Sequence, residues 1–454
     1  MQQPTKIKNF MSNKIDTKKN QLLIFSTAAA LGGLLFGFDT GVISGAIHFI
    51  KIEFNLNAYQ EGFAVSNLMI ACVVGALLAG PIADWTGRKK VLILCAVLFT
   101  VSAILSALPR SFTELVIARF IGGMGVGMAS VVSPMYIAEI SPAKIRGRLV
   151  ALNQLAIVVG ILLSYFSNWV LVDTGINNWR YMLVAEILPA ITFLVGLFFI
   201  PESPRWLTKE GLEKEALDVL NVVAGAANSD HELQEVKKSL AEKSTSLKEL
   251  LHPSLRRVLI VGILFSLFAH ITGIDTIIYY GPIIFLESGF KTDSALLASV
   301  MIGITNLIFT FVGMAMVDKA GRKFLLLVGL AGMGISMMLV GFCMQSDIIS
   351  AKWTLLWIMT YIASFAMSIG VVIWVYLSEI YPTRVRGQAL SVATMVLWLG
   401  NVILTQLFPV MMERFGGGTF YIFSFICLLA FIFTWTMVKE TKGVSLEEIE
   451  EMWV

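Results

Sequence analysis

Twelve apolar stretches dominate this sequence, and each is long enough to cross a membrane as a helix. About 20 apolar residues span the roughly 30 Å of hydrocarbon in a bilayer. Of the 454 residues, 57% are hydrophobic and only 14% are charged, whereas soluble domains carry about 25% charged residues. Disordered, secreted disulfide-rich and ordinary soluble classes are therefore excluded. We expect an all-α integral membrane protein with transmembrane helices near residues 22–50, 60–83, 91–108, 113–137, 149–172, 181–200, 257–287, 295–317, 324–344, 353–379, 388–411 and 418–438.

A polar stretch between the sixth and seventh apolar stretches divides the chain into two halves of six. It contains runs such as LEKEALDVL and HELQEVKKSLAEK, whose composition favours helices. The expected organisation is an N-terminal tail (1–21), a first six-helix half (22–200), a linker of helices (201–256), a second six-helix half (257–438) and a C-terminal tail (439–454).

Positive charge is distributed unevenly over the loops. Of the 34 Lys and Arg residues, 27 lie in the two tails, the linker and the loops after stretches two, four, eight and ten, and six lie in the alternate loops. The remaining one, Arg119, lies inside a stretch. Because Lys and Arg concentrate in cytoplasmic loops, we expect both tails and the linker on the cytoplasmic side of the cell (inner or plasma) membrane.

Two loop motifs occur once in each half. Residues 84–89 (DWTGRK) recur as 318–323 (DKAGRK), 234 residues later, and residues 139–147 (EISPAKIRG) recur as 379–387 (EIYPTRVRG), 240 residues later. Two six-helix halves in the same orientation form a parallel repeat about an axis along the membrane normal. Such folds hold a substrate site between the halves near the midplane and expose it by alternating access.

These loop motifs resemble those of the major facilitator superfamily. Four further strings resemble its sugar porter family, and in particular bacterial proton-coupled sugar symporters: GGLLFGFDTGVISG (32–45), RFIGGMGVGMASVVSPMYIAEISPAKIRG (119–147), PESPRWL (201–207) and KETKGVSLEEIEE (439–451). The last string begins Lys439-Glu440 where the family usually has Pro-Glu. The resemblance implies a secondary active transporter that imports a monosaccharide or polyol with a proton by alternating access.

Charged residues in the repeated loops form a candidate cytoplasmic gate. The loops are too short to separate their carboxylates from their arginines, so bidentate pairs across helix ends are expected to latch the cytoplasmic side. The alternative is solvated charge that only sets topology, worth about 0–1 kcal/mol per exposed pair. The resemblance implies that two residues of PESPRWL, Glu202 and Arg205, belong to the same network. The candidate gate residues are Asp84, Arg88, Glu139, Arg146, Glu202, Arg205, Asp318, Arg322, Glu379 and Arg386.

Three ionisable residues, Asp39, Arg119 and Glu186, lie inside apolar stretches of the first half. A charge near the bilayer centre costs about 2.5–3.5 kcal/mol on insertion scales, so each needs a partner or a purpose. The resemblance implies that Asp39 and Arg119 form a pair that protonation breaks, and that Glu186 is an accessory acid. The alternatives are a static structural pair and, for Glu186, a role at a cytoplasmic helix end.

A sugar site needs side-chain amides for the hydroxyl groups and a flat apolar surface for the C–H face. The resemblance places such groups on stretches five, eight, ten and eleven, and a gate on the extracellular side of stretch seven. For each residue alone, helix packing or a place in an interfacial aromatic belt is the alternative. The candidates are Gln154, Asn306, Trp374, Trp398 and Asn401 for the site and Tyr279 for the gate.

Stretch seven departs from the family pattern. Sugar porters usually have Gln-Gln-x-x-Gly-x-Asn before a tyrosine pair, whereas this chain has Ala269-His270-Ile271-Thr272-Gly273-Ile274-Asp275. Residues 273–276 (GIDT) also echo residues 37–40 (GFDT), 236 residues earlier. We expect His270 and Asp275 to form a second titratable element that binds a polyol or takes part in proton coupling. Alternatively, a protonated Asp275 does the hydrogen bonding of the missing asparagine.

Other function classes fit the sequence less well. The alternatives within transport are a proton-independent sugar uniporter and a carrier of another small polar solute, and a non-transporting sugar sensor is disfavoured by the short C-terminal tail. An enzyme is not expected, because the sequence lacks a GxxxxGK[ST] loop and its four histidines lack metal-binding spacing. The expected partners are a sugar or polyol, a proton and membrane lipid, with no cofactor, metal or nucleic acid, in a protein that functions as a monomer.

Overall fold

The computed structural model describes residues 4–142, 145–223, 225, 228–241, 253–346, 351–381, 385–444 and 448. Part of the expected linker (242–252) and most of the expected C-terminal tail (445–447 and 449–454) lie outside the described residues. Within the described ranges every regular element is a helix.

The structure confirms twelve helical spans long and apolar enough to cross a membrane. They are formed by α1 (Pro4–Glu53), α2 (Ala58–Thr86), α3 (Arg88–Ala107), α4 (Phe112–Ile140), α5 (Arg146–Leu171), α6 with α7 (Asn178–Val184, Ile187–Phe198), α11 with α12 (Pro253–Ile271, Ile274–Glu287), α13 (Thr292–Ala320), α14 (Arg322–Gln345), α15 with α16 (Ala351–Met367, Ile369–Ile380), α17 (Arg386–Phe415) and α18 (Gly418–Met437). The polar stretch between the halves contains α8 (Pro204–Lys209), α9 (Glu213–Val223) and α10 (Ser229–Ala241).

Three spans that the apolar pattern predicts as continuous helices are interrupted. Span six breaks after Val184, span seven after Ile271 and span ten after Met367. At the break in span seven Gly273 has φ 104°, a left-handed conformation that glycine adopts without steric cost. Hydrophobicity does not reveal such breaks, because an apolar run reads the same whether or not the helix is continuous.

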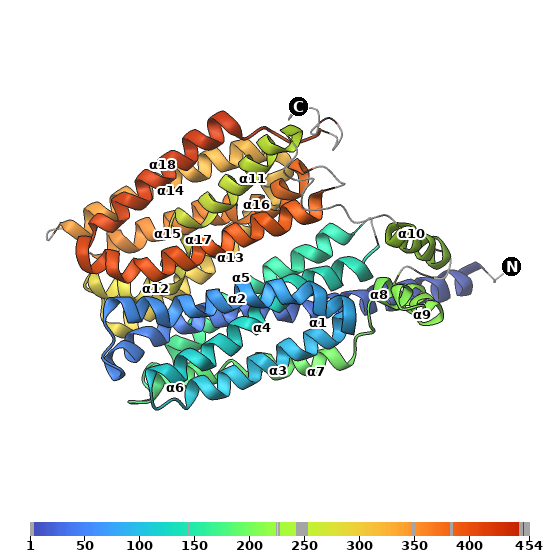
Figure 1. Ribbon diagram of the computed structural model, residues 1–454, viewed down its shortest axis with the longest axis horizontal. Helices are drawn as coiled ribbons and strands as arrows, with labels where there is room; N and C mark the ends of the chain where they lie inside the picture. The colour runs from blue at the N-terminus through green and yellow to red at the C-terminus, as the bar shows by residue number, and fades with distance from the viewer. Residues whose placement is uncertain are drawn as a thin grey trace.

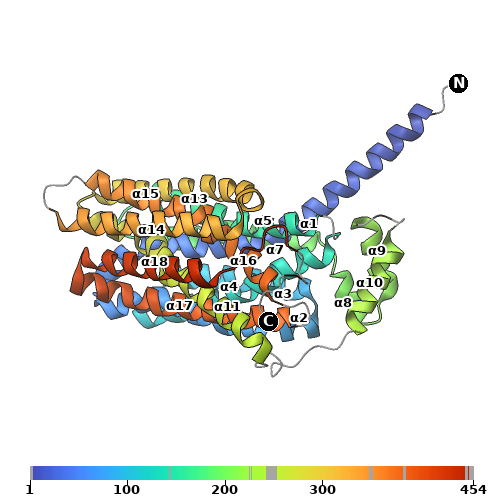
Figure 2. The same ribbon diagram turned by 90° about the horizontal axis from the view of Figure 1, so that it is seen from above.

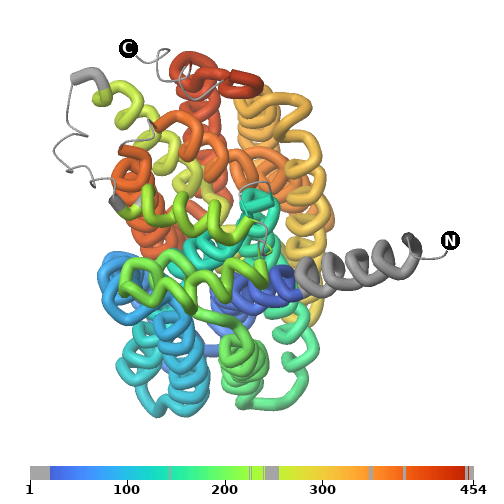
Figure 3. Tube along the Cα trace, turned by 90° about the vertical axis from the view of Figure 1, so that its right-hand side faces the viewer, coloured from blue at the N-terminus to red at the C-terminus, as the bar shows by residue number. Residues whose placement is uncertain are grey.

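The two halves lie side by side. In Figure 1 the first half, from blue to green, lies below the second half, from yellow to red, and the linker helices sit together at one end. We call this end the linker side and the opposite end the far side. Figure 2 shows α8, α9 and α10 grouped beyond the end of the bundle, and Figure 3 shows them across the end of the first half.

In the described ranges, three helix pairs make the most extensive contacts between the halves. α2 packs against α17, α5 packs against α13, and α1 contacts α12. The unbroken α1 and the broken span seven therefore face each other across the interface between the halves. This arrangement brings Asp39 on α1 and Asp275 on α12 to helices that meet at this interface.

Candidate transport site

Asp39 and Arg119 form an ion pair inside the first half. Arg119 Nη1 of α4 lies 2.6 Å from Asp39 Oδ1 of α1, and each side chain is 3% exposed. The pair leaves Asp39 Oδ2 and the Nε and Nη2 groups of Arg119 without a hydrogen-bond partner among the described residues. A buried ion pair with unpaired donors and acceptors is energetically costly. The charge state of this pair is therefore sensitive to any further ionisable group nearby.

Glu186 is such a group. It lies at the break between α6 and α7, is 3% exposed and interacts electrostatically with both Asp39 and Arg119. The residue lies inside span six (Asn178–Phe198) and not at either end of it. Two carboxyl groups thus interact electrostatically with one guanidinium, and these three groups together are electrically neutral only when one carboxyl carries a proton.

The second half has its own acid–base pair at the break in span seven. His270 in the last turn of α11 bonds through Nδ1 to Oδ2 of Asp275 in the first turn of α12. The two side chains are 18% and 11% exposed, so the pair is partly open to solvent, unlike the Asp39–Arg119 pair. The two residues expected to act together are thus in direct contact.

Several expected sugar-site residues lie buried near this pair or near the interface. Asn401 is 3% exposed, with Oδ1 unpaired among the described residues, and it follows Gly400, where a Cβ would lie 3.9 Å from His270 Cβ. Trp398 is 5% exposed, and its ring lies 5.6 Å from that of Phe36 on α1. The Trp398 indole and the Asn401 amide thus lie on α17, which packs against α11, the helix that carries the His270 imidazole.

The remaining expected sugar-site residues have fewer contacts. Asn306 of α13 is 7% exposed and lies 3.5 Å from the hydroxyl of Thr310 on its own helix. Gln154 of α5 is half-buried, and Trp374 of α16 is 44% exposed. Among the described residues, Gln154 and Trp374 form no hydrogen-bonded cluster with the other expected sugar-site residues.

Tyr279 belongs to a set of contacts that close the halves toward the far side. Its hydroxyl lies 3.4 Å from Thr40 Oγ1 and 3.5 Å from Met69 Sδ, both in the first half. One peptide away, the Ile278 carbonyl accepts a bond of 2.6 Å from the Tyr165 hydroxyl. Helix α12 is therefore tied to the first half at two adjacent residues.

Further toward the far side, Gln406 links α17 to α2. Its Oε1 accepts a bond of 2.7 Å from Ser66 Oγ, and its Nε2 donates one of 2.9 Å to the Tyr59 carbonyl. Trp169 Nε1 of α5 donates a bond of 3.0 Å to Asp293 Oδ1 of α13. Sequence reasoning missed these residues, because single polar residues in apolar helices give no sign of their partner.

A cavity of about 420 Å³ also lies on the far side. It is lined by both halves, and it contains the ion pair of Lys51 with buried Glu61, 2.7 Å apart. The lining residues are His48, Lys51, Ile52, Asn55, Leu56, Glu61, Ile283, Leu286 and Glu287. The cavity was not predicted, because its residues come from helix ends that are distant in sequence.

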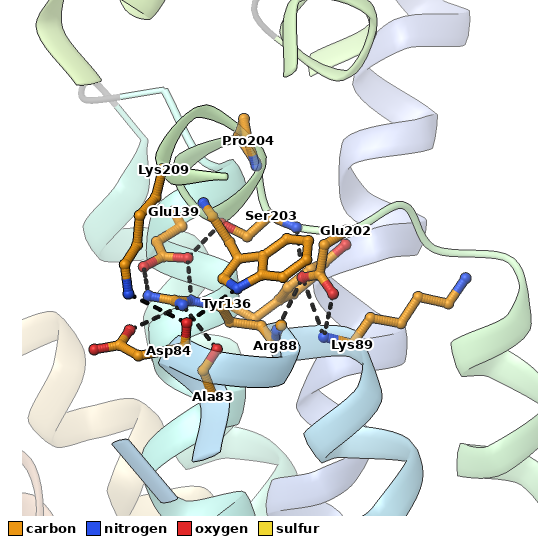
Figure 4. A network of polar contacts seen from close by, with 12 residues as sticks. Ala83, Asp84, Arg88, Lys89, Tyr136, Glu139, Glu202, Ser203, Pro204 and Lys209 are labelled. Carbon is orange, nitrogen blue, oxygen red and sulfur yellow. Dashed lines mark hydrogen bonds and ion pairs between the residues drawn. The ribbon is translucent and has the colours of Figure 1, made fainter. Parts of the chain in front are cut away.

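On the linker side, Arg88 anchors a cluster within the first half (Figure 4). Its guanidinium makes two parallel bonds to Glu139 of α4, with Nε–Oε2 at 2.9 Å and Nη2–Oε1 at 3.0 Å, and lies 3.0 Å from Asp84. Glu202 accepts bonds from the backbone N–H groups of Arg88, at 2.9 Å, and Lys89, at 3.2 Å. Burial raises the pKa of the Glu202 carboxyl.

The second half repeats this cluster. Arg322 bonds to Glu379 through Nη2–Oε1 at 2.9 Å and Nε–Oε2 at 3.2 Å and lies 3.1 Å from Asp318. Glu440 takes the part of Glu202 and accepts the N–H groups of Arg322, at 2.9 Å, and Lys323, at 3.0 Å. The sequence analysis did not include Glu440 in the gate, although its place after the twelfth span matches that of Glu202 after the sixth.

Not all of the expected gate residues take part in these clusters. The ion pairs of Arg88 and Arg322 join helix ends within one half. Arg205 was expected in the same network, but it is exposed and has no ion pair among the described residues. Arg146 and Arg386 donate through Nε to the carbonyls of Ser141, at 3.3 Å, and Tyr381, at 3.2 Å. The clusters thus tie together the helices of each half.

The comparisons with known proteins agree with this architecture. The family described as "Sugar (and other) transporter" matches residues 25–453. The arabinose-proton symporter of Bacillus subtilis is 41% identical over 441 residues, covering 95% of each chain. The D-xylose-proton symporter of Escherichia coli K12 is 39% identical, with 97% of each chain covered.

A solved structure of the E. coli xylose transporter XylE, described as its inward open conformation, matches with a TM-score of 0.84 at 37% identity, covering 95% of this chain and 100% of the other. The fold, the duplicated clusters and the matched sequence range point to one conclusion. The chain belongs to the sugar transporter family of the major facilitator superfamily.

Proposed function

We propose that this protein imports a monosaccharide or polyol together with a proton, by alternating access across the cell membrane. The observation that carries the proposal is the buried group of Asp39, Arg119 and Glu186, in which two carboxyl groups share one guanidinium. The arabinose-proton and xylose-proton symporters among the relatives support the same reading.

The charge count of this group explains how a proton could be coupled to transport. With both carboxyls ionised, the group carries one net negative charge in a site closed to water, which is unfavourable. Binding one proton neutralises the group and frees Arg119 from one of its two acids. Asp39, which holds Arg119 directly, is the proposed coupling acid, and Glu186 is the accessory acid that keeps the guanidinium compensated when Asp39 is protonated.

The proposed sugar site lies where the halves face each other. Gln154, Asn306 and Asn401 supply amides, and Trp398 supplies an aromatic face. His270 and Asp275 are accessible to a solute, since both side chains are partly exposed. Trp374 is proposed as a further wall of the cavity and Tyr279 as its gate on the far side. Such a mixture of donors, acceptors and apolar surface suits a neutral polyhydroxylated solute.

The proposed orientation places the linker side in the cytoplasm. An even number of spans puts Gln21 and Met437 on the same side, and the excess of Lys and Arg on that side supports a cytoplasmic location. The linker-side clusters, including Arg146, Arg205 and Arg386, would then surround the cytoplasmic exit. Each half closes its own clusters, which supports function as a monomer.

Sugar-driven proton uptake tests this function. In proteoliposomes without a pH gradient, addition of the correct solute from a panel of arabinose, xylose, glucose and myo-inositol should alkalinise the external medium. Asp39→Asn fixes a neutral side chain at the coupling position, so it should abolish alkalinisation and uphill accumulation while exchange of labelled solute continues.

The matched control is Asp173→Asn, which changes an exposed aspartate outside the buried group. It should behave as the wild type does. Uptake of a panel sugar without alkalinisation in the wild type would instead identify a uniporter, and full accumulation by Asp39→Asn would exclude Asp39 as the coupling acid.

A further inference from the structure

The His270–Asp275 contact exists because span seven is broken. In a continuous helix, residues five apart point in directions about 140° apart and do not meet. Here α11 ends at Ile271 and α12 begins at Ile274, and Gly273 between them has φ 104°. The side chains of His270 and Asp275 therefore bond across the break and connect the two half-helices.

The break itself is held in place by its surroundings. The Thr272 carbonyl, which the break frees, accepts a bond of 3.1 Å from the Tyr361 hydroxyl of α15. Gly273 lies against the Phe423 ring of α18, where a Cβ would come within 3.0 Å of Cγ. A break whose backbone groups are paired in this way is a defined hinge and not a frayed helix end.

The two half-helices have different attachments. α11 packs against α16, α17 and α18 of its own half. α12 carries Ile278 and Tyr279, which bond to Tyr165 and Thr40 of the first half. A change in the angle between α11 and α12 therefore moves the element that closes the halves toward the far side.

We propose that His270 and Asp275 are a positioning pair that clasps α12 to α11 and so holds the far side shut. This inference rests on the proposed alternating access and deepens it. The pair is partly exposed, so hydroxyl groups of a bound solute can compete for both side chains. Loss of the His270–Asp275 bond removes a stabilising contact from the closed state. States in which α12 has moved away from the first half then become more populated.

Cysteine labelling measures the clasp without any need for transport. Met69 lies behind Tyr279 and is 0% exposed, so Met69→Cys reports when the far side opens to a membrane-impermeant maleimide. The four native cysteines are buried, and the parental protein sets their background. His270→Ala and Asp275→Ala should each raise the labelling rate about tenfold, as expected for loss of one charge-assisted hydrogen bond.

Two further variants separate a clasp from general loosening. The double variant His270→Ala/Asp275→Ala should label no faster than either single variant, because both changes remove the same interaction. His270→Gln/Asp275→Asn restores a hydrogen-bonded pair without charge and should return labelling toward the wild-type rate. His231→Ala, which changes an exposed histidine of the linker helix α10, is the matched control.

The outcomes are decisive in both directions. Unchanged labelling in the single variants, or additive effects in the double variant, would overturn the proposal. Should the alanine variants fail to fold, His270→Phe and Asp275→Leu, which fill the space but cannot form the hydrogen bond, give the same comparison. Because labelling needs neither sugar nor a proton gradient, a failed uptake assay with intact labelling effects would count against the proposed function and leave the clasp standing.

Discussion

At the scale of single residues, the charged groups around Arg88 and Arg322 on the linker side form two nearly identical clusters. Glu202 and Glu440 each accept the first N–H groups of a helix, those of α3 and α14. Gly87 and Gly321, with φ 100° and 93°, precede these helices, and a Cβ on either would crowd the carboxylate. The glycine of each D-x-x-G-R motif therefore makes room for an acid that comes from a distant part of the chain.

We predict that Glu202→Ala and Glu440→Ala destabilise the protein by similar amounts. Each change leaves two backbone donors without their acceptor, which costs about 1–3 kcal/mol for a buried group. Thermal unfolding of the purified protein in detergent should show both losses. The control Glu210→Ala changes an exposed residue of the linker and should unfold as the wild type does. A loss confined to Glu202→Ala would show that the second cluster is not equivalent to the first.

The cost of Glu202→Ala should also depend on pH. Because burial raises the pKa of Glu202 above 4.5, the folded protein retains a proton there that the unfolded chain has lost. This contribution to stability is complete below pH 4.5 and is lost as the pH rises through the raised pKa. The difference in unfolding temperature between wild type and Glu202→Ala should therefore narrow on going from acid to neutral pH.

At the scale of helices, the breaks in spans six and seven coincide with residues that we propose to be functional. Glu186 lies at one break, and His270 and Asp275 flank the other. The sequence singled out all three residues, two of them because they depart from a family pattern. It did not predict the breaks that bring them to their partners, because those depend on tertiary contacts such as that of Gly273 with Phe423.

We predict that Gly273→Ala destabilises the protein, whereas Gly281→Ala in the same span does not. Alanine at Gly273 would pay about 1–2 kcal/mol for the left-handed conformation and would also push against the Phe423 ring. At Gly281 a Cβ would meet Ile302 Cδ1 at 3.4 Å, an ordinary contact, inside a regular helix that favours alanine. Unfolding temperatures measure the difference, and equal values for the two variants would show that the hinge conformation is not strained by a side chain.

At the scale of the whole molecule, the structure is closed toward the far side. The bonds of Gln406, Tyr165 and Tyr279 join the halves there, while the clusters of Arg88 and Arg322 on the linker side close within their own halves.

We predict that Gln406→Leu shifts the protein toward states that are open on the far side. The change removes two hydrogen bonds between α17 and α2, each worth about 0.5–1.5 kcal/mol. Spin labels at Tyr59 and Glu413, both exposed on the far side, should report a larger population of long distances by double electron–electron resonance. Gln345→Leu, on the far side but outside the interface, should leave the distances unchanged. No shift in Gln406→Leu would mean that apolar packing alone closes this side.

The sequence predicted the large features of the molecule well, since length, hydropathy and repetition fix twelve spans in two halves. A charge inside an apolar helix requires a partner, and the family resemblance implied that Arg119 is the partner of Asp39. Gln406 and Trp169 could not be matched to partners, because their contacts join segments more than a hundred residues apart. Lys51 could not be matched either, because its partner lies at another helix end and belongs to no motif.

The two linker-side clusters also differ in when they can form during synthesis. Arg88 lies in the first half and Glu202 directly follows it, so this cluster can form before the second half is translated. The cluster of Arg322 needs Glu440, which follows the twelfth span, and can form only after that span has been made. During synthesis the second half therefore passes through a longer period in which its linker-side charges lack their partner.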